Sequence, residues 1–260
     1  MLSLFLFYVF LCVGDVKTNN GGWYTEKKDI VGREGPCNIE RYAAEDLDQN
    51  EFLRRFAYHE PLVIYNIDNK EFRRLTMRKK MMEDWKNTPV TLNSANTYSY
   101  IRIPTTFQEY IEHRLKPQSR DIRGNETMYL FGDIDQKLWA PLLTAYRIPK
   151  WSLPGHSPGL SFGIAGAGTG VPFHFHGPVF AEVIYGSKRW FLYPFEDRPA
   201  FDPDISTLEW YLSEYPSLPR EKRPFECVLK PGEIIYLPDK WWHATLNTET
   251  SVFISTFLSP

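Results

Sequence analysis

The sequence lacks any excess of positive charge. Its 260 residues include 30 Lys and Arg against 32 Asp and Glu, which leaves a formal net charge of -2. Proteins that bind the nucleic-acid backbone neutralise several phosphates with Lys and Arg, so a chain without a cationic surplus does not fit that class. The residues are 43% hydrophobic and 16% aromatic, enough to bury a sizeable core. We therefore expect a folded domain and no nucleic-acid partner.

Long apolar runs are absent beyond the N-terminus. Residues 1–13 read MLSLFLFYVFLCV, a run too short to span a bilayer comfortably, and Gly14 and Asp15 follow it. The small residues Cys12 and Gly14 suit cleavage, although the segment has no positively charged start. We predict a signal peptide over residues 1–14, with a signal anchor as the alternative, and no membrane span once the signal is removed.

Cysteine is scarce. Of three cysteines, Cys12 leaves with the signal peptide, and Cys37 and Cys227 remain in a compartment that favours oxidation. We predict that these two form a disulfide; two buried free thiols are the alternative for a cytosolic chain. Asn125 begins the one N-glycosylation acceptor, Asn-Glu-Thr, after a polar stretch that resembles an exposed loop. Asn125 is therefore a predicted glycosylation site.

Composition divides the remaining chain. Residues 15–36 are polar and lack apolar periodicity, which predicts a flexible N-terminal lead-in without core residues. Residues 37–260 are expected to form a single domain. Its N-terminal part, 37–158, should combine helices and strands, and residues 159–258 should form a β-rich core.

Local signals place elements in both parts. Capping patterns that start at Asp48 and Thr106 predict two helices, and apolar residues from Leu62 predict a strand between them. After residue 160, short apolar segments alternate with Gly and Pro turns, interrupted by a helix near 206–214. The predicted strands there are 161–165, 179–185, 189–193, 225–229, 233–237, 242–246 and 252–257. Many short strands with turn punctuation indicate a mainly β sandwich or jelly roll with added helices.

Three of the six histidines fall in this β-rich half. His174 and His176 are separated by one residue, so on a strand both would project to one face, and His243 follows 67 residues later. Two imidazoles on one face and a third from a distant strand could complete a metal site. Imidazole binds iron, zinc, copper and nickel, so the residue type does not select the metal. Surface or hydrogen-bonded histidines are the alternative.

Three segments carry a resemblance to a known family. Residues 171–176 (VPFHFH), 186–190 (GSKRW) and 237–243 (LPDKWWH) follow the order of a JmjC hydroxylase domain, and the Pro-x-x-Trp-Trp-His element is the most specific. The similarity covers most of residues 37–258. The resemblance implies a double-stranded β-helix of the cupin type and a place in the lumen of the endoplasmic reticulum.

The resemblance also implies roles for named residues. In active JmjC enzymes a His-x-Asp/Glu pair and a distal His hold Fe(II), and a strand lysine binds the far carboxylate of 2-oxoglutarate. His174, His243 and Lys188 match these positions, whereas His176 stands where the family has a carboxylate. Glu182 offers a rival carboxylate ligand at a spacing close to the cupin motif, with a buried structural role as its alternative. For Lys188 the alternative is a solvated residue in a turn.

Two functions follow from these features. The first is a non-catalytic luminal protein that acts through protein partners on a JmjC shell, which the missing carboxylate favours; the resemblance implies that it regulates cell signalling and metabolism. The second is an Fe(II)- and 2-oxoglutarate-dependent hydroxylase of protein side chains in the secretory pathway. JmjC relatives often dimerise, so self-association is expected too. The chain ends Phe257-Leu258-Ser259-Pro260, without a KDEL-type retention signal.

Overall fold

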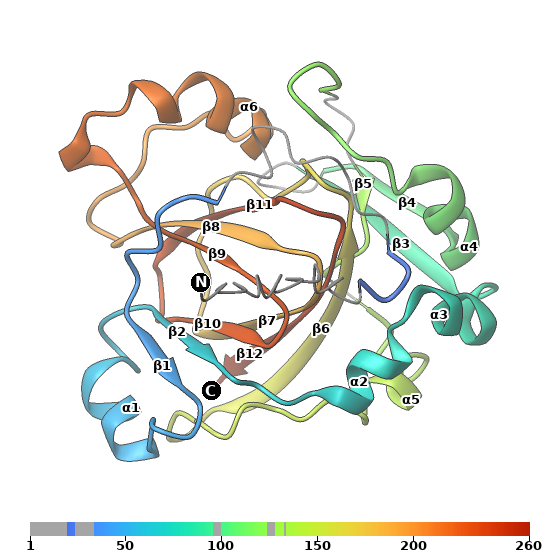
Figure 1. The fold of residues 1–260 in the computed structure, drawn as a ribbon, viewed down its shortest axis with the longest axis horizontal. Helices are drawn as coiled ribbons and strands as arrows, with labels where there is room; N and C mark the ends of the chain where they lie inside the picture. The colour runs from blue at the N-terminus through green and yellow to red at the C-terminus, as the bar shows by residue number, and fades with distance from the viewer. Residues whose placement is uncertain (1–19, 24–33, 96–99, 124–127, 133) are drawn as a thin grey trace, which may run out of the picture.

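A computed structural model of the chain describes residues 20–23, 34–95, 100–123, 128–132 and 134–260 (Figure 1). The predicted signal peptide, 1–14, and the predicted glycosylation site, Asn125, lie outside the described residues. Both stay predictions.

Two facing sheets form the centre of the molecule (Figure 1). The first sheet has the strand order β1-β2-β10-β7-β12-β6, and the second has the order β11-β8-β9. The strands of the first sheet are β1 (Arg41–Ala43), β2 (Leu62–Tyr65), β10 (Glu233–Leu237), β7 (Val179–Tyr185), β12 (Ser251–Ser259) and β6 (Ser157–Ala165). Those of the second are β11 (Trp242–Asn247), β8 (Lys188–Tyr193) and β9 (Phe225–Leu229). The prediction of a mainly β, cupin-type double-stranded β-helix is confirmed.

The central strand β7 shows why its sequence is apolar throughout. Val179, Ala181 and Val183 pack in the core between the sheets, together with Trp190 of β8, while Phe180 belongs to a second core on the other face. A strand that is buried on both faces has no polar alternation to display. All seven strands predicted after residue 160 are present, each with ends within four residues of those predicted.

A smaller sheet and several helices stand beside this centre. The sheet has the order β4-β3-β5, with β3 (Pro89–Ser94), β4 (Arg102–Thr106) and β5 (Met128–Tyr129). The α-helices are α1 (Gln49–Arg55), α2 (Lys70–Leu75), α3 (Arg78–Trp85), α4 (Phe107–Glu109), α5 (Ala140–Leu143) and α6 (Thr207–Ser213). Shorter turns are the π-helical η1 (Tyr110–Arg114) and the 3-10 turns η2 (Tyr215–Ser217) and η3 (Arg220–Lys222). Asp48, Thr106 and Ser206 cap α1, α4 and α6 through their side chains.

The N-terminal lead-in differs from its prediction at residues 20–23. Trp23 is 2% exposed and joins the core that contains Phe72, and its indole N–H donates to the Thr76 carbonyl oxygen at 2.9 Å. Gly21 has φ +65° and lies against the Tyr185 ring, where a Cβ would be 2.5 Å from the nearest ring atom. An isolated indole among polar residues shows no periodicity, so the sequence alone did not reveal this anchor.

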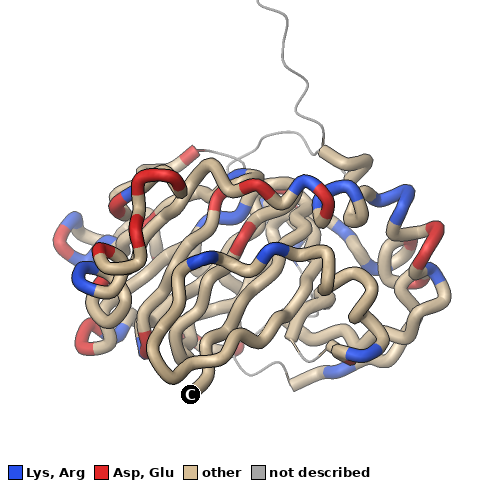
Figure 2. Tube along the Cα trace, turned by 90° about the horizontal axis from the view of Figure 1, so that it is seen from below, with Lys and Arg blue, Asp and Glu red and all other residues tan. Residues whose placement is uncertain are grey.

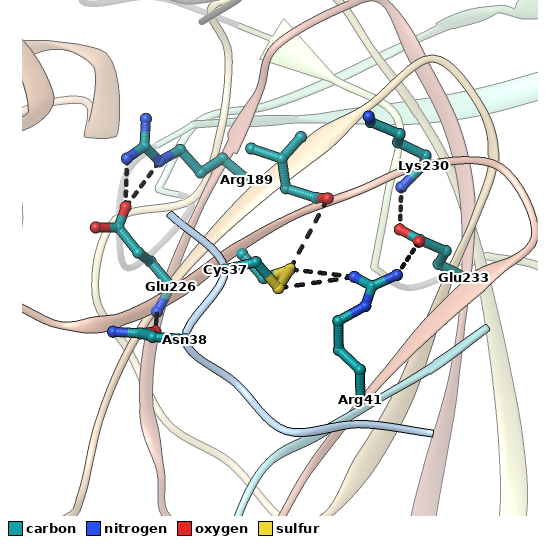
Figure 3. The surroundings of a disulfide bond; sticks show 9 residues. Cys37, Asn38, Arg41, Arg189, Glu226, Lys230 and Glu233 are labelled. Carbon is teal, nitrogen blue, oxygen red and sulfur yellow. Dashed lines mark hydrogen bonds and ion pairs between the residues drawn. A yellow bond between two sulfur atoms is a disulfide. The ribbon is translucent and has the colours of Figure 1, made fainter. Parts of the chain in front are cut away.

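The second tie at the N-terminus is the disulfide, which joins Cys37 to Cys227 of β9 across 190 residues (Figure 3). The Arg41 guanidinium lies 3.6 Å from both sulfur atoms and pairs with Glu233. The next residue, Asn38, exchanges backbone and side-chain hydrogen bonds with Glu226, which pairs with Arg189 of β8. The side chains of Arg189 and Glu226 are 3% and 2% exposed, so this ion pair is buried beneath the N-terminal segment.

Lys and Arg are interspersed with Asp and Glu along the described chain, as Figure 2 shows. Within the described ranges, none of the helices has the length and apolar character needed to cross a membrane.

Candidate metal centre

Backbone pairing brings the three predicted histidines together. His174 and His243 form an isolated antiparallel bridge, with N–H to O distances of 3.1 Å from His174 and 2.8 Å from His243. His176 lies two residues further along the extended segment, and the Lys240 N–H donates to its carbonyl oxygen at 3.0 Å. One nitrogen from each of the three rings lies within 4.8 Å of the other two. The i, i+2 spacing thus places two imidazoles beside the third, which β11 supplies.

The other nitrogen of each ring is held by the backbone. In every case Nδ1 is hydrogen-bonded to a carbonyl oxygen, and a carbonyl oxygen only accepts. The acceptors for His174, His176 and His243 are the carbonyls of Pro172 (2.8 Å), Gly177 (2.7 Å) and Trp241 (2.9 Å). Nδ1 therefore carries the proton in each neutral ring, and Nε2 presents a lone pair, which is the arrangement that orients a histidine as a metal ligand.

The separation of the ligand atoms fits a divalent metal. His176 Nε2 and His243 Nε2 are 3.1 Å apart. A metal about 2.1 Å from each nitrogen, bound at a right angle, gives a nitrogen separation of about 3 Å. Without a cation between them, two lone pairs would face each other. The residues present thus fit a metal held on one face by three neutral imidazoles.

Burial keeps these rings neutral. Loss of solvation, helped by the neighbouring histidine, lowers the pKa of His174 to about 4. The same cause lowers the pKa of His176, and it lowers the pKa of His243 well below the usual range, with the other two rings adding to the effect. All three rings are therefore free of protons on Nε2 at neutral pH and ready to bind a metal.

A pocket extends from the three histidines between the sheets, and Lys188 lines it. Lys188 is 6% exposed, and its Nζ lies 3.2 Å from the centre of the Phe253 ring. Burial lowers the pKa of this ammonium to about 7. The alternative of a solvated turn residue is wrong, because Lys188 is the first residue of β8 and its side chain lies inside the molecule. A buried cation beside the metal ligands suits an anionic ligand.

Comparisons with known proteins agree with this architecture. The model of the Cupin-like domain matches residues 179–257. JmjC domain-containing protein 8 of Rattus norvegicus is 47% identical over 262 residues, which cover 99% of this chain and 97% of that protein; the Homo sapiens protein of the same name is 46% identical over 259 residues, with the same coverage. The chain belongs to the JmjC domain-containing protein 8 family. More distantly, Lysine-specific demethylase JMJ21 of Arabidopsis thaliana is 26% identical over 252 residues, which cover 84% of this chain and 25% of that protein. The X-ray structure of E. coli ycfD has a similar fold, with a TM-score of 0.51 at 18% identity, covering 82% of this chain and 53% of that one.

The expectation that Glu182 could be a carboxylate ligand of the metal is wrong. Along β7 it alternates with Ala181 and Val183, which face the core between the sheets, so its side chain leaves the opposite face of the strand. There its carboxylate accepts a hydrogen bond from Asn69 Nδ2 at 2.7 Å. Burial raises the pKa of Glu182 to about 7, and the hydrogen bond from Asn69 acts in the opposite direction. Within the described part of the chain, no carboxylate joins the three histidines.

Sequence reasoning missed two polar residues of the JmjC pocket, Trp190 and Asn247. Trp190 is two residues from Lys188 on β8, and Asn247 is four residues from His243 on β11. Even spacing on a strand keeps each on the same face as its partner. Register counting from the two residues singled out in the sequence would have found both.

Proposed function

We propose that this JmjC-domain protein acts in the lumen of the endoplasmic reticulum as a regulator of cell signalling and metabolism, through contacts with partner proteins. The observation that carries the proposal is the set of three neutral imidazole ligands, His174, His176 and His243. No carboxylate of the described residues lies in this cluster. A carboxylate ligand contributes one negative charge that balances Fe(II), and a site of imidazoles alone leaves the full charge of the ion uncompensated. This change weakens the case for oxygenase turnover and favours a role on the protein surface.

Exposed aromatic side chains beside the metal centre support a contact surface. Phe175, between two of the ligands, is 43% exposed and Phe195 is 46% exposed. Phe175 packs edge-on against Phe195 and Trp242, with ring centres 5.5 and 4.8 Å apart. Clustered exposed aromatic residues are typical of protein-binding surfaces. Self-association through the same face is included in the proposal.

The disulfide supports the proposed compartment. Bonds such as Cys37–Cys227 persist in oxidising environments and are rare in the cytosol. The predicted signal peptide would bring the chain there.

The test is complementation in cells that lack the protein, with a signalling reporter as the readout. His176→Ala, which removes a metal ligand, should restore the signal, and Phe175→Ser/Phe195→Ser should not. A matched control is Tyr58→Ser, which changes an exposed aromatic residue (57% exposed) on another part of the surface. Loss of signalling with His176→Ala at normal protein level, or full signalling with the aromatic double variant, would contradict a regulatory surface.

A second candidate is an Fe(II)- and 2-oxoglutarate-dependent hydroxylase of protein side chains, and buried Lys188 is the observation that favours it. His174, His176 and His243 would hold the iron, which supplies oxygen activation when bound. Lys188 would bind the far carboxylate of 2-oxoglutarate, and the aromatic walls at Trp190 and Phe253 would exclude water.

Its test measures iron content and succinate formation from 2-oxoglutarate on protein from a secretory host. About one equivalent of iron with succinate formation that Lys188→Met abolishes would establish the hydroxylase candidate. The variant His176→Asp restores the family's carboxylate. Turnover only in His176→Asp would mean that the pocket is competent and that the ligand change silences it, which supports the regulator.

A further inference from the structure

Three polar groups that line the pocket lack partners within the described part of the chain. The indole Nε1 of Trp190 and the amide Oδ1 of Asn247 are buried without a hydrogen bond. The ammonium of Lys188 lies over the faces of Phe253 and Trp190, and no described anion or hydrogen-bond acceptor pairs with it. Leaving buried polar groups unpaired costs free energy, and their concentration in one pocket indicates a ligand that pairs with them.

The orientation of the Asn247 amide is determined by its neighbours. Its Nδ2 donates to the Thr169 carbonyl oxygen at 2.8 Å and to Thr169 Oγ1 at 3.2 Å. Thr169 Oγ1 itself donates to the Gly166 carbonyl at 2.6 Å, so it is available to Asn247 only as an acceptor. A flipped amide would place Oδ1 against two acceptors. Oδ1 of Asn247 is therefore an acceptor that needs a donor from elsewhere.

Strand register places Asn247, which carries the acceptor, and Lys188, which carries the cation, side by side in the pocket. In the β11–β8 pairing, Asn247 lies opposite Lys188, and Thr245 lies opposite Trp190. Cross-strand neighbours of this kind have Cβ atoms about 5 Å apart. His243, four residues from Asn247 on the same strand face, marks the metal end. The Trp190 ring lies between the metal end and Lys188: its centre is 5.9 Å from the centre of the His243 ring and 5.8 Å from Lys188 Nζ.

At the end of the pocket formed by Lys188 and Asn247, a ligand must have two features. Lys188 requires an anion, and Asn247 Oδ1 beside it requires a hydrogen-bond donor. A plain dicarboxylate or 2-oxoglutarate supplies the anion but no donor. An amino group would supply the donor with a positive charge next to the ammonium, which is unfavourable. A hydroxyl next to a carboxylate satisfies both groups without added charge.

We propose that the pocket binds a short hydroxy-dicarboxylate, with one carboxylate at Lys188 and the adjacent hydroxyl donating to Asn247 Oδ1. The Trp190 indole N–H is then available to a second oxygen of the ligand. This inference holds for a regulator and for a hydroxylase alike, since it concerns the far end of the pocket and not the metal chemistry. A hydroxy acid of the surrounding metabolism would thus compete with 2-oxoglutarate or signal through the same pocket.

The experiment is isothermal titration of the folded chain with succinate, L-malate and D-malate, which share four carbons and differ only in the hydroxyl and its configuration. It is done with metal-free protein and with Zn(II)-loaded protein, because a hydroxy acid could also bind a metal. One malate enantiomer should bind about tenfold more tightly than succinate in both forms, as expected for one added hydrogen bond to a buried acceptor. The Asn247→Leu variant should bring malate and succinate to equal affinity, and Lys188→Met should weaken both.

Three results would overturn the proposal. They are equal affinity for malate and succinate in the natural chain, a malate preference seen only with Zn(II), and a preference that persists in Asn247→Leu. The first comparison needs no variant, so it stands even if Asn247→Leu does not fold. A chain that binds no metal but prefers malate would refute the metal centre and leave the hydroxy-acid pocket intact.

Discussion

His176 Nε2 and His243 Nε2 lie 3.1 Å apart, and each ring uses its Nδ1 proton for a backbone carbonyl. Neither nitrogen has a proton to give the other while both rings are neutral. The pair is therefore built for a cation, and the third ring, His174, lies within the same cluster.

This arrangement predicts the result of histidine replacement. His176→Ala and His243→Ala should each reduce bound divalent metal from about one equivalent to less than a tenth, because a two-imidazole site binds far more weakly. Elemental analysis after dialysis measures this loss. His113→Ala is the control, since its side chain is 65% exposed and far in sequence from the site. Equal metal content in all four proteins would contradict the metal centre.

Glu182 predicts a pH dependence of stability. Burial raises its pKa from 4.5 to about 7, so the folded chain holds a proton there that the unfolded chain has lost between those values. Stability from this group is therefore present below pH 4.5 and falls as pH rises towards 7, by up to about 3 kcal/mol. Glu182→Gln should remove that loss.

Urea unfolding at pH 5 and pH 8 checks this prediction. The unfolding free energy of Glu182→Gln minus that of the natural chain should be more positive at pH 8 than at pH 5. Asp68→Asn, which changes a half-exposed carboxylate, is the matched control. A Glu182→Gln effect that is the same at both pH values would show that the carboxyl does not titrate in this range.

The disulfide predicts a large loss of stability on removal. Cys37–Cys227 closes a loop of 190 residues, and its loss should lower the free energy of unfolding by about 2–5 kcal/mol. Cys37→Ser/Cys227→Ser in urea unfolding measures the change. If the double variant is as stable as the natural chain, the contacts of Asn38 with Glu226 suffice to hold the N-terminal segment.

The buried pair of Arg189 and Glu226 predicts coupling between two substitutions. Arg189→Met leaves Glu226 as a buried charge and should cost about 3–5 kcal/mol, although Tyr215 still donates to it. Arg189→Met/Glu226→Leu should recover most of that loss, since no buried charge remains. A double-mutant cycle from urea unfolding supplies the coupling energy, and additive losses would argue against a buried ion pair.

The sequence by itself determined the strands of the β-rich half and the family. Segments 179–185 and 233–237 are short apolar runs between Gly and Pro turns, and their local pattern was enough to predict β7 and β10. The capping pattern at Asp48 likewise placed the start of α1. The i, i+2 spacing of His174 and His176 predicted that they share a face, because side-chain alternation is a local property of an extended chain.

Only the tertiary structure decided which other residues join the site and the core. The spacing of Glu182 did not show that its side chain leaves the far face of β7, since that depends on which sheet covers the strand. Trp23 belongs to no periodic pattern, yet it is buried. Its indole N–H donates to the carbonyl oxygen of Thr76, which is 53 residues away in the sequence. From the sequence alone, Lys188 could be a solvated turn residue or a buried cation. The structure shows it buried, because Phe253 of the facing sheet lies over its ammonium. Burial depends on chain segments far away in sequence, and local pattern therefore cannot assign it.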